Sequence, residues 1–415
     1  MLQKFVVVAG ALLALAGPSF AAPVAIRAKQ ALDVKSGTLI ENAVVLVDGE
    51  RITAAGAGLA IPDGATVIDL KDVTLLPGLV DCHTHLMASS ADEYATMLLT
   101  KSQAYRALEG AADARRTLLA GFTSVRDVEN EGSGYADIAL RDAIERGLVE
   151  GPRMKVATRG IAAIGQYVPF GISSDLPDFP RGAQMISGVE EARRAAREQI
   201  GNGANHLKVY ADWEYPTLTA EELRVIVEEA HKAGLRVAAH ATTPEGILNA
   251  VNAGVDSIEH GDLPDRKTLE LMKQKNVWLV PTLAVMLAHL DEVKSEEGRK
   301  RFTAYLENKK KALQSAREVG VKIAIGYDPA NADVHGTNAR EIVAMTTAGF
   351  TNLELLRAAT LGGAELLGWQ DRIGSLEAGK FADIIAVAGN PLTDIHQLER
   401  VVFVMKGGVV VKNGQ

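Results

Sequence analysis

Six side chains that can bind a metal ion or transfer a proton come directly after apolar runs of the sequence. His83 and His85 form an H-x-H pair, and residues two apart on a strand point to the same side. Imidazole and carboxylate groups are good ligands for divalent transition metals, whereas burying them without a partner is costly. The pattern predicts a metal site built from His83, His85, Lys208, His240, His260 and Asp328.

Lys208 needs a role of its own in this set, because an ammonium group cannot bind a metal ion. Two alternatives are open. Lys208 could form a salt bridge with Asp328, or its neutral amine could react with CO2 to give a carbamate. A carbamate is an anionic ligand that can bridge two metal ions, and its formation requires that burial lower the pKa of the lysine.

The segments that end in these residues alternate with helical patterns through the middle of the chain. Eight strand–helix repeats predict an α/β fold, a (β/α)8 barrel, in which reactive groups lie at the C-terminal ends of the strands. All six residues would then face one mouth of the barrel. The expected strands are 76–81, 123–128, 154–159, 206–210, 236–241, 257–261, 278–283 and 322–328.

Several helix starts can be read from the sequence. In a capping box, a Ser or Thr and a Glu three residues later satisfy the free amides of the first turn. Proline also suits the first helical position, where Pro244 is expected. The long connection 284–318 is expected to carry extra helix over the barrel mouth. The expected capping boxes are Ser187 with Glu190, Thr219 with Glu222, and Thr351 with Glu354.

Both ends of the chain after residue 22 have the character of short β-strands. Residues 43–47 and 51–56 flank the turn Asp48-Gly49-Glu50, which is a hairpin signature. Residues 382–387, 401–406 and 409–412 continue the pattern near the C-terminus. We therefore expect residues 23–79 and 370–415 to form one small β-sandwich beside a barrel of residues 80–369.

The composition excludes several classes of protein. Among 415 residues, 47% are hydrophobic and 23% are charged, which is typical of a globular chain and not of a disordered one. The net charge of −8 argues against nucleic acid as a partner, since phosphate binding needs a basic surface. Cys82 is the single cysteine, which excludes an internal disulfide and a cysteine-based zinc site.

Residues 1–22 have the pattern of a secretory signal peptide. Lys4 precedes an uncharged apolar stretch at 5–17, Pro18 interrupts it, and small residues follow. The stretch is shorter than the roughly 20 residues that a transmembrane span needs. We expect a cleaved leader, a net charge that changes from −8 to −9 with the loss of Lys4, and an exported, periplasmic or extracellular protein with no membrane segment after cleavage.

The ordered set of residues resembles the metal-dependent amidohydrolase superfamily. The matching stretches are PGLVDCHTH at 77–85, the four later site residues, and GSLEAGKFAD at 374–383, so the resemblance covers essentially the whole chain after the leader. It is strongest with the prolidase-like and imidazolonepropionase-related subgroup. That subgroup includes exported Xaa-Pro dipeptidases, carboxypeptidases acting on dipeptides with C-terminal Lys or Arg, and ochratoxin-degrading amidases. One departure is Tyr327, where a small threonine is commoner.

The resemblance implies a site with two metal ions, most often zinc. His83, His85 and Asp328 would hold the more buried ion, and His240 and His260 would hold the other. A carbamate on Lys208 and a hydroxide would bridge the two, and the cations would lower the pKa of that water toward 7. Asp328 would accept the proton of the attacking hydroxide and pass it to the leaving amine. The resemblance also implies a homo-oligomer.

The expected reaction is hydrolysis of the amide bond to a C-terminal amino acid in a small dipeptide or N-acyl amino acid. Such a substrate needs a donor for its free carboxylate, and we favour Tyr210 and His335. Other polar residues at or beyond the expected strand ends are Arg126, Arg159 and Tyr167.

Two other functions stay open. A one-metal deaminase or imidazolonepropionase uses the same fold, although Lys208 favours two metal ions and the leader argues against cytosolic catabolism. A non-enzymatic binding protein on the same barrel would have lost ligands, and all six are present. Metal analysis separates these alternatives, since they require two, one and no equivalents.

Overall fold

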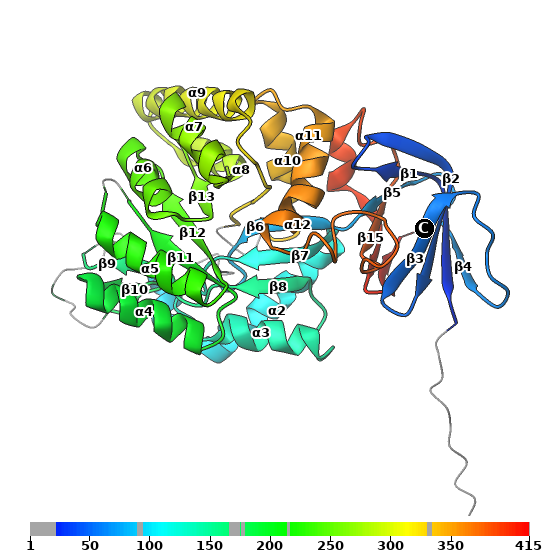
Figure 1. The fold of residues 1–415 in the computed structure, drawn as a ribbon, viewed down its shortest axis with the longest axis horizontal. Helices are drawn as coiled ribbons and strands as arrows, with labels where there is room; N and C mark the ends of the chain where they lie inside the picture. The colour runs from blue at the N-terminus through cyan, green and yellow to red at the C-terminus, as the bar shows by residue number, and fades with distance from the viewer. Residues whose placement is uncertain are drawn as a thin grey trace, which may run out of the picture.

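The chain forms a mixed α/β structure with a separate β-region at one side (Figure 1). The computed structural model describes residues 22–88, 94–165, 175, 179–213, 216–329 and 334–414, so the expected leader lies almost wholly outside the described residues. Within those ranges, no helix has the length and hydropathy needed to cross a bilayer.

The β-region is one eight-stranded sheet built from both ends of the chain. β15 pairs with β5, which joins the C-terminal strands to the N-terminal ones, and the expected hairpin is confirmed by the pairing of Asp48 with Arg51. Its buried side chains, among them Ile26, Val45 and Phe403, form their own core. The strands are β1 (Val24–Asp33), β2 (Thr38–Asp48), β3 (Arg51–Ala57), β4 (Thr66–Asp69), β5 (Thr74–Pro77), β15 (Ile384–Val387), β16 (Val401–Lys406) and β17 (Val409–Asn413).

The α/β region holds two parallel sheets. One has the order β6-β7-β8, and the other has the order β10-β9-β11-β12-β13-β14. Seven of the eight expected strands are present here, with ends that differ by a few residues. The bounds are β6 (Leu79–Thr84), β7 (Phe122–Asp127), β8 (Arg153–Val156), β9 (Ile161–Ala163), β10 (Gln184–Ile186), β11 (His206–Tyr210), β12 (Arg236–Ala241), β13 (Ser257–His260) and β14 (Trp278–Val280).

The prediction of an eighth strand at 322–328 is wrong. This described segment has a single parallel bridge, from Ile323 to Leu279 of β14, and no regular strand. It still lies beside β6, because two backbone hydrogen bonds join them. Cys82 N donates to Ile325 O at 2.8 Å, and Asp328 N donates to His83 O at 2.8 Å. The ladder is interrupted at Tyr327, whose N–H donates to a side chain, the carboxylate of Asp81, at 3.1 Å.

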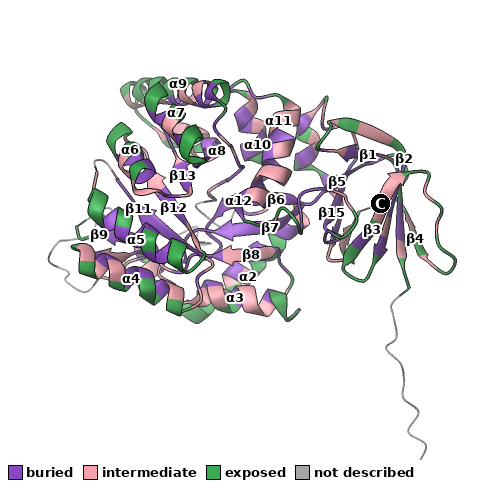
Figure 2. Ribbon diagram, viewed as in Figure 1, coloured by how far each residue is buried: buried purple, intermediate pink, exposed green. Residues whose placement is uncertain are grey.

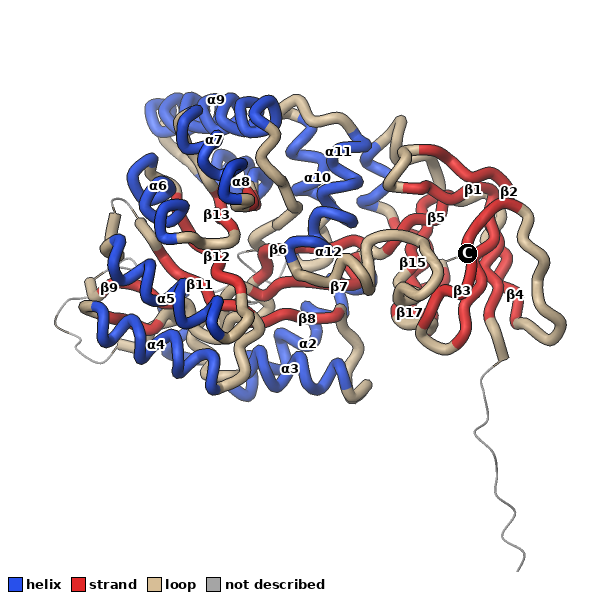
Figure 3. Tube along the Cα trace, in the orientation of Figure 1, coloured by secondary structure: helices blue, strands red, loops and turns tan. Residues whose placement is uncertain are grey.

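Helices cover the outside of these strands, as the blue helices around the red strands in Figure 3 show. The boxes Thr219–Glu222 and Thr351–Glu354 are confirmed, and Pro244 begins its helix. The helices are α1 (Tyr94–Thr100), α2 (Gln103–Leu119), α3 (Ala136–Glu145), α4 (Val189–Gly201), α5 (Ala220–Lys232), α6 (Pro244–Ala253), α7 (Arg266–Lys275), α8 (Leu283–Glu292), α9 (Glu296–Val319), α10 (Ala339–Thr346), α11 (Asn352–Arg357) and α12 (Gly363–Leu366).

The expected capping box of Ser187 and Glu190 is wrong. α4 begins one residue later, with Gly188 before it at φ 89°, a left-handed conformation that suits glycine. The N–H of Ser187 donates to Glu191 at 2.6 Å instead. The connection 284–318 does carry extra helix, since it holds most of both α8 and α9.

The main core lies between the parallel strands and the helices. Buried strands occupy the centre of Figure 2, and the helices expose only their outer faces. On α5, for example, Leu223 and Ile226 are fully buried against the strands. Burying one such side chain contributes roughly 1.5–3 kcal/mol, so the helices hold the strand ends firmly in place.

Candidate active site

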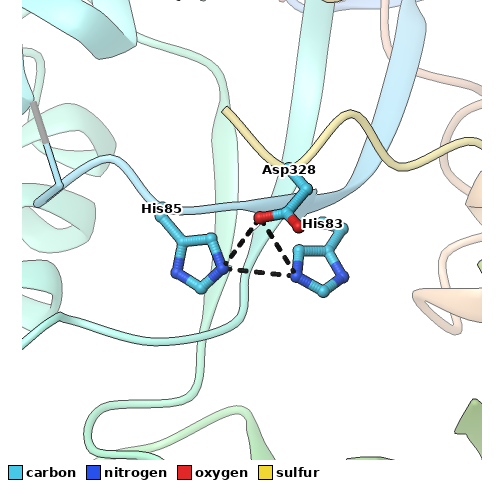
Figure 4. A group of neighbouring side chains, drawn as sticks. All are labelled: His83, His85 and Asp328. Atoms are coloured by element: carbon cyan, nitrogen blue, oxygen red, sulfur yellow. Dashed lines mark hydrogen bonds and ion pairs between the residues drawn. The ribbon is translucent and has the colours of Figure 1, made fainter. Parts of the chain in front are cut away.

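Three of the expected ligands converge where β6 ends (Figure 4). Nε2 of His83 and Nε2 of His85 lie 3.3 Å apart, and the Asp328 carboxylate reaches both, at 3.6 Å from the first and 3.3 Å from the second. All of these ligand atoms lie within 4.8 Å of one another. Three potential ligands at this spacing can hold one metal ion.

The other expected residues adjoin this group. The ring of His260 lies 5.1 Å from that of His83 and 4.5 Å from that of His240, and Asp328 Oδ2 lies 3.8 Å from Nδ1 of His260. The ring of Tyr210 is 5.3 Å from that of His240, and the Lys208 ammonium is 5.2 Å from the Tyr210 ring. The residues come from four strands and the segment after Lys322, and the fold brings them together.

His83 is held by Glu259, which forms a buried ion pair with Arg126. Its Nδ1 lies 2.8 Å from Glu259, whose other oxygen accepts from Arg126 at 2.7 Å. Burial raises the pKa of Glu259, but the Arg126 charge and the His83 bond outweigh it and keep the pKa well below its usual range. Burial lowers the pKa of His83 to about 4. His83 is therefore neutral at pH 7, as a metal ligand must be.

His85 and Asp328 are electrostatically linked. Burial opposes charge on both, yet Glu131, 2.8 Å from Nδ1 of His85, and Asp328 raise the pKa of His85 well above its usual value. His85 must therefore release a proton when it binds a metal ion. Conversely, burial raises the pKa of Asp328, and His83 and His85 outweigh burial and hold it well below its usual range. Asp328 is thus a carboxylate, able to bind a cation or accept a proton.

Lys208 lies on β11 and is almost completely buried. Burial lowers its pKa, although Glu259, Asp328 and Glu129 favour the charged form. A lowered pKa increases the fraction of neutral amine, which is the form that reacts with CO2.

Strained backbone gathers around the site. Asp328, His260, Thr282 and Glu131 all have positive φ, at 58°, 69°, 49° and 52°, although none is glycine. Such conformations cost of order 1–3 kcal/mol each and persist only where the surroundings fix them. Such outliers gather at active sites and ligand clamps in other proteins, so their presence here favours this region as the candidate site.

Sequence reasoning missed Asp81, which joins the two segments that carry His83 and Asp328. Its carboxylate accepts from His83 N at 3.0 Å, from Tyr327 N at 3.1 Å and from the Asn338 amide at 2.7 Å. Burial raises its pKa to about 7. An acid inside an apolar strand was the available signal, since such a group needs several hydrogen-bond donors.

The candidate substrate residues separate into different places. Tyr210 lies at the site, with its hydroxyl donating to the buried carboxylate of Glu129. His335 is buried beside His85, and burial together with the charge of His85 lowers the pKa of His335 to about 3; His335 also lines a cavity of about 520 Å³ with Arg116 and Arg340. Arg126 is occupied by Glu259. The Arg159 side chain donates to the backbone carbonyls of Gly182 and Ala183. The remaining candidate, Tyr167, lies outside the described residues.

Known proteins resemble this chain along most of its length. A family model described as the amidohydrolase family matches residues 74–411. The ochratoxinase of Aspergillus niger is 32% identical, over 91% of this chain and 84% of that protein. The crystal structure of a Xaa-Pro dipeptidase with bound methionine has a TM-score of 0.86 at 33% identity, covering 94% of this chain and 100% of that one. A prolidase complexed with N-methylphosphonate-L-proline has a TM-score of 0.85 at 31% identity, with 94% and 100% covered.

Proposed function

The chain belongs to the amidohydrolase family and is a hydrolytic enzyme, and from this premise we propose that it uses two metal ions to cleave the amide bond to a C-terminal amino acid. The substrates are dipeptides or N-acyl amino acids. The observation that carries the proposal is the convergence of His83, His85 and Asp328 on one point, with His240, His260 and Lys208 adjoining it.

The residues fit a pair of metal ions. The donor set is nitrogen and carboxylate oxygen, which zinc accepts. Each outer nitrogen of the H-x-H pair faces a carboxylate, Glu259 or Glu131, an arrangement that orients metal-binding histidines in other proteins. In the proposed assignment, His83, His85 and Asp328 would hold one ion, and His240 and His260 would hold the other. Lys208, as a carbamate, would add an anionic ligand to the pair.

The metal ions would supply activated water at neutral pH and polarisation of the scissile carbonyl. The side chains of the chain would do the rest. Asp328 accepts the proton of the attacking water and delivers it to the leaving amine, since its low pKa keeps it a carboxylate at the start. Glu259 and Arg126 keep His83 in position. Tyr210, beside the His240 ring, and His335, beside His85, are proposed to contact the substrate.

The substrate class rests on the similar proteins. One is an ochratoxinase, one is a Xaa-Pro dipeptidase and one is a prolidase with a proline-containing ligand. Ochratoxin A and a dipeptide share an amide that links an acyl group to a C-terminal amino acid. The site is proposed to accept that shared unit.

We also propose a closed (β/α)8 barrel with a β-sandwich, and domains at 80–369 and at 23–79 with 370–415. Two links between the parallel sheets support closure. Segment 322–328 bonds to both β14 and β6, and Asn205 N, just before β11, donates to Val156 O of β8 at 2.8 Å. The proposed leader at 1–22 makes the protein exported, periplasmic or extracellular, and a homo-oligomer is proposed from the family. N-terminal sequencing of the secreted protein tests the leader.

A substrate screen tests the function. Purified protein loaded with zinc and bicarbonate is assayed against dipeptides, N-acyl amino acids and ochratoxin A, with Asp328→Asn as the matched inactive control. We expect hydrolysis in at least one of these classes and none by the control. Turnover of cyclic amidines or aminopurines alone, with one zinc per chain, would favour the deaminase-like alternative.

A further inference from the structure

The start of α8 has an unusual capping arrangement. A threonine that precedes a helix commonly accepts a hydrogen bond from an N–H of the first turn. Among the described residues, the Thr282 side chain makes no such capping bond, and its hydroxyl lies 2.7 Å from Nδ1 of His260. The first amides of α8 therefore need another acceptor.

Glu341, on α10, is that acceptor. Its two oxygens accept from the backbone N–H groups of Leu283 at 2.9 Å and Ala284 at 2.6 Å. The carboxylate is fully buried, and an anion at a helix N-terminus interacts favourably with the free N–H groups and the helix dipole. One helix thus caps another, and the Thr282 hydroxyl is left available for His260.

The backbone supports the same link. Thr282 and His260 have φ of 49° and 69°, in the left-handed region. For a β-branched residue this is a true outlier, which persists only where neighbouring groups hold it. The residues held by Glu341 follow Thr282 directly, so the Glu341 bonds fix the strained turn that presents the hydroxyl.

We propose that Glu341 and Thr282 are positioning residues for His260. Glu341 fixes the start of α8, Thr282 Oγ1 accepts the proton of His260 Nδ1, and Nε2 is left unprotonated and able to bind a metal ion. The hydrogen bond at one ring nitrogen decides which nitrogen can bind the metal. This inference rests on the proposed metal site.

Zinc affinity in the full-length protein tests the proposal. Thr282→Val removes the hydroxyl at nearly constant volume, and Glu341→Gln replaces one accepting oxygen with an amide that cannot accept. Each variant should weaken the second zinc about 10–100-fold in chelator competition. The double variant should bind zinc no more weakly than the weaker-binding single variant, because both substitutions act through His260. Thr282→Ser should restore the affinity.

Glu222→Gln is a matched control. Glu222 also accepts from two backbone N–H groups, those of Gly188 at 2.6 Å and Thr219 at 2.8 Å, but at the start of α5. It should lower the thermal midpoint and leave zinc affinity unchanged. The proposal is overturned if Glu341→Gln behaves like this control or if Thr282→Val binds zinc normally. It is also overturned if the losses of zinc affinity in the two single variants add in the double variant. Should Glu341→Gln fail to fold, the zinc affinities of Thr282→Val and Thr282→Ser test the proposal by themselves. A wild-type protein that binds fewer than two zinc ions would overturn the proposed function itself.

Discussion

Replacing Glu259 with glutamine should disable His83 as a metal ligand. Glu259 is fully buried and shared between Nδ1 of His83 at 2.8 Å and the guanidinium of Arg126 at 2.7 Å. Arg126 can only donate, so the new amide must turn its oxygen toward Arg126. Its NH2 group then faces Nδ1 of His83. This stabilises the tautomer with the proton on Nε2, the nitrogen that lies closest to His85 and Asp328.

Two magnitudes follow from this geometry. Arg126 is 3% exposed, so losing its counter-charge should cost about 3–5 kcal/mol of unfolding free energy. Losing the correct tautomer should weaken the zinc ion held by His83, His85 and Asp328 about 10–100-fold. That loss corresponds to about 1.4–2.7 kcal/mol of binding free energy.

Urea unfolding of the metal-free protein and zinc competition measure the two effects separately. The control is Glu259→Gln combined with Arg126→Met. Without the guanidinium, the amide can rotate and offer its oxygen to His83, so both stability and zinc affinity should partly recover. Wild-type zinc affinity in Glu259→Gln would refute this reasoning. A double variant that binds zinc more weakly than Glu259→Gln alone would refute it too.

Three further changes probe the site and the fold. Asp328→Asn should keep the circular dichroism spectrum and lower kcat by about 10²–10⁴-fold, and near-normal kinetics would reassign the proton transfer. Lys208→Ala should lower the zinc content below that of the wild type and abolish turnover, whereas unchanged zinc would exclude a bridging carbamate. Hydrogen bonds from Arg197 and Arg193 lower the pKa of Glu229 from 4.5 to about 2, so its stabilising effect is present above pH 4.5 and lost as the pH falls toward 2. Glu229→Gln should therefore lower the urea midpoint at pH 7 but not near pH 2, and equal shifts at both pH values would contradict the linkage.

The sequence predicts seven of the parallel strands because each is a short, largely apolar run, and four of these runs carry or directly precede a candidate ligand. β11 and β12 have the expected bounds, and most other strands differ by a few residues. The last segment departs from a strand because the Asp81 carboxylate takes the N–H of Tyr327. Such a contact joins residues 246 positions apart and has no local signature.

The candidate ligands were visible for a similar reason. Taken alone, each of these residues has an ordinary structural explanation, and it was their joint placement after successive apolar runs that predicted a site. Their partners were not visible, because a glutamate such as Glu341 gives no sign in the sequence of which amides it will bind. Arg126 shows the limit most clearly. Its strand-end position allowed either a substrate contact or a structural salt bridge, and the fold pairs it with Glu259, 133 residues later, which the sequence did not identify as its partner.

The number of metal ions per chain tests the central claim most directly. Protein dialysed against zinc and bicarbonate, then freed of loose metal, is measured by elemental analysis alongside a variant in which His83 and His240 are both alanine. We predict two zinc ions per wild-type chain and a large loss in the variant. A wild-type protein without bound metal, or a variant that retains both ions, would contradict the claim that these side chains form a binuclear centre.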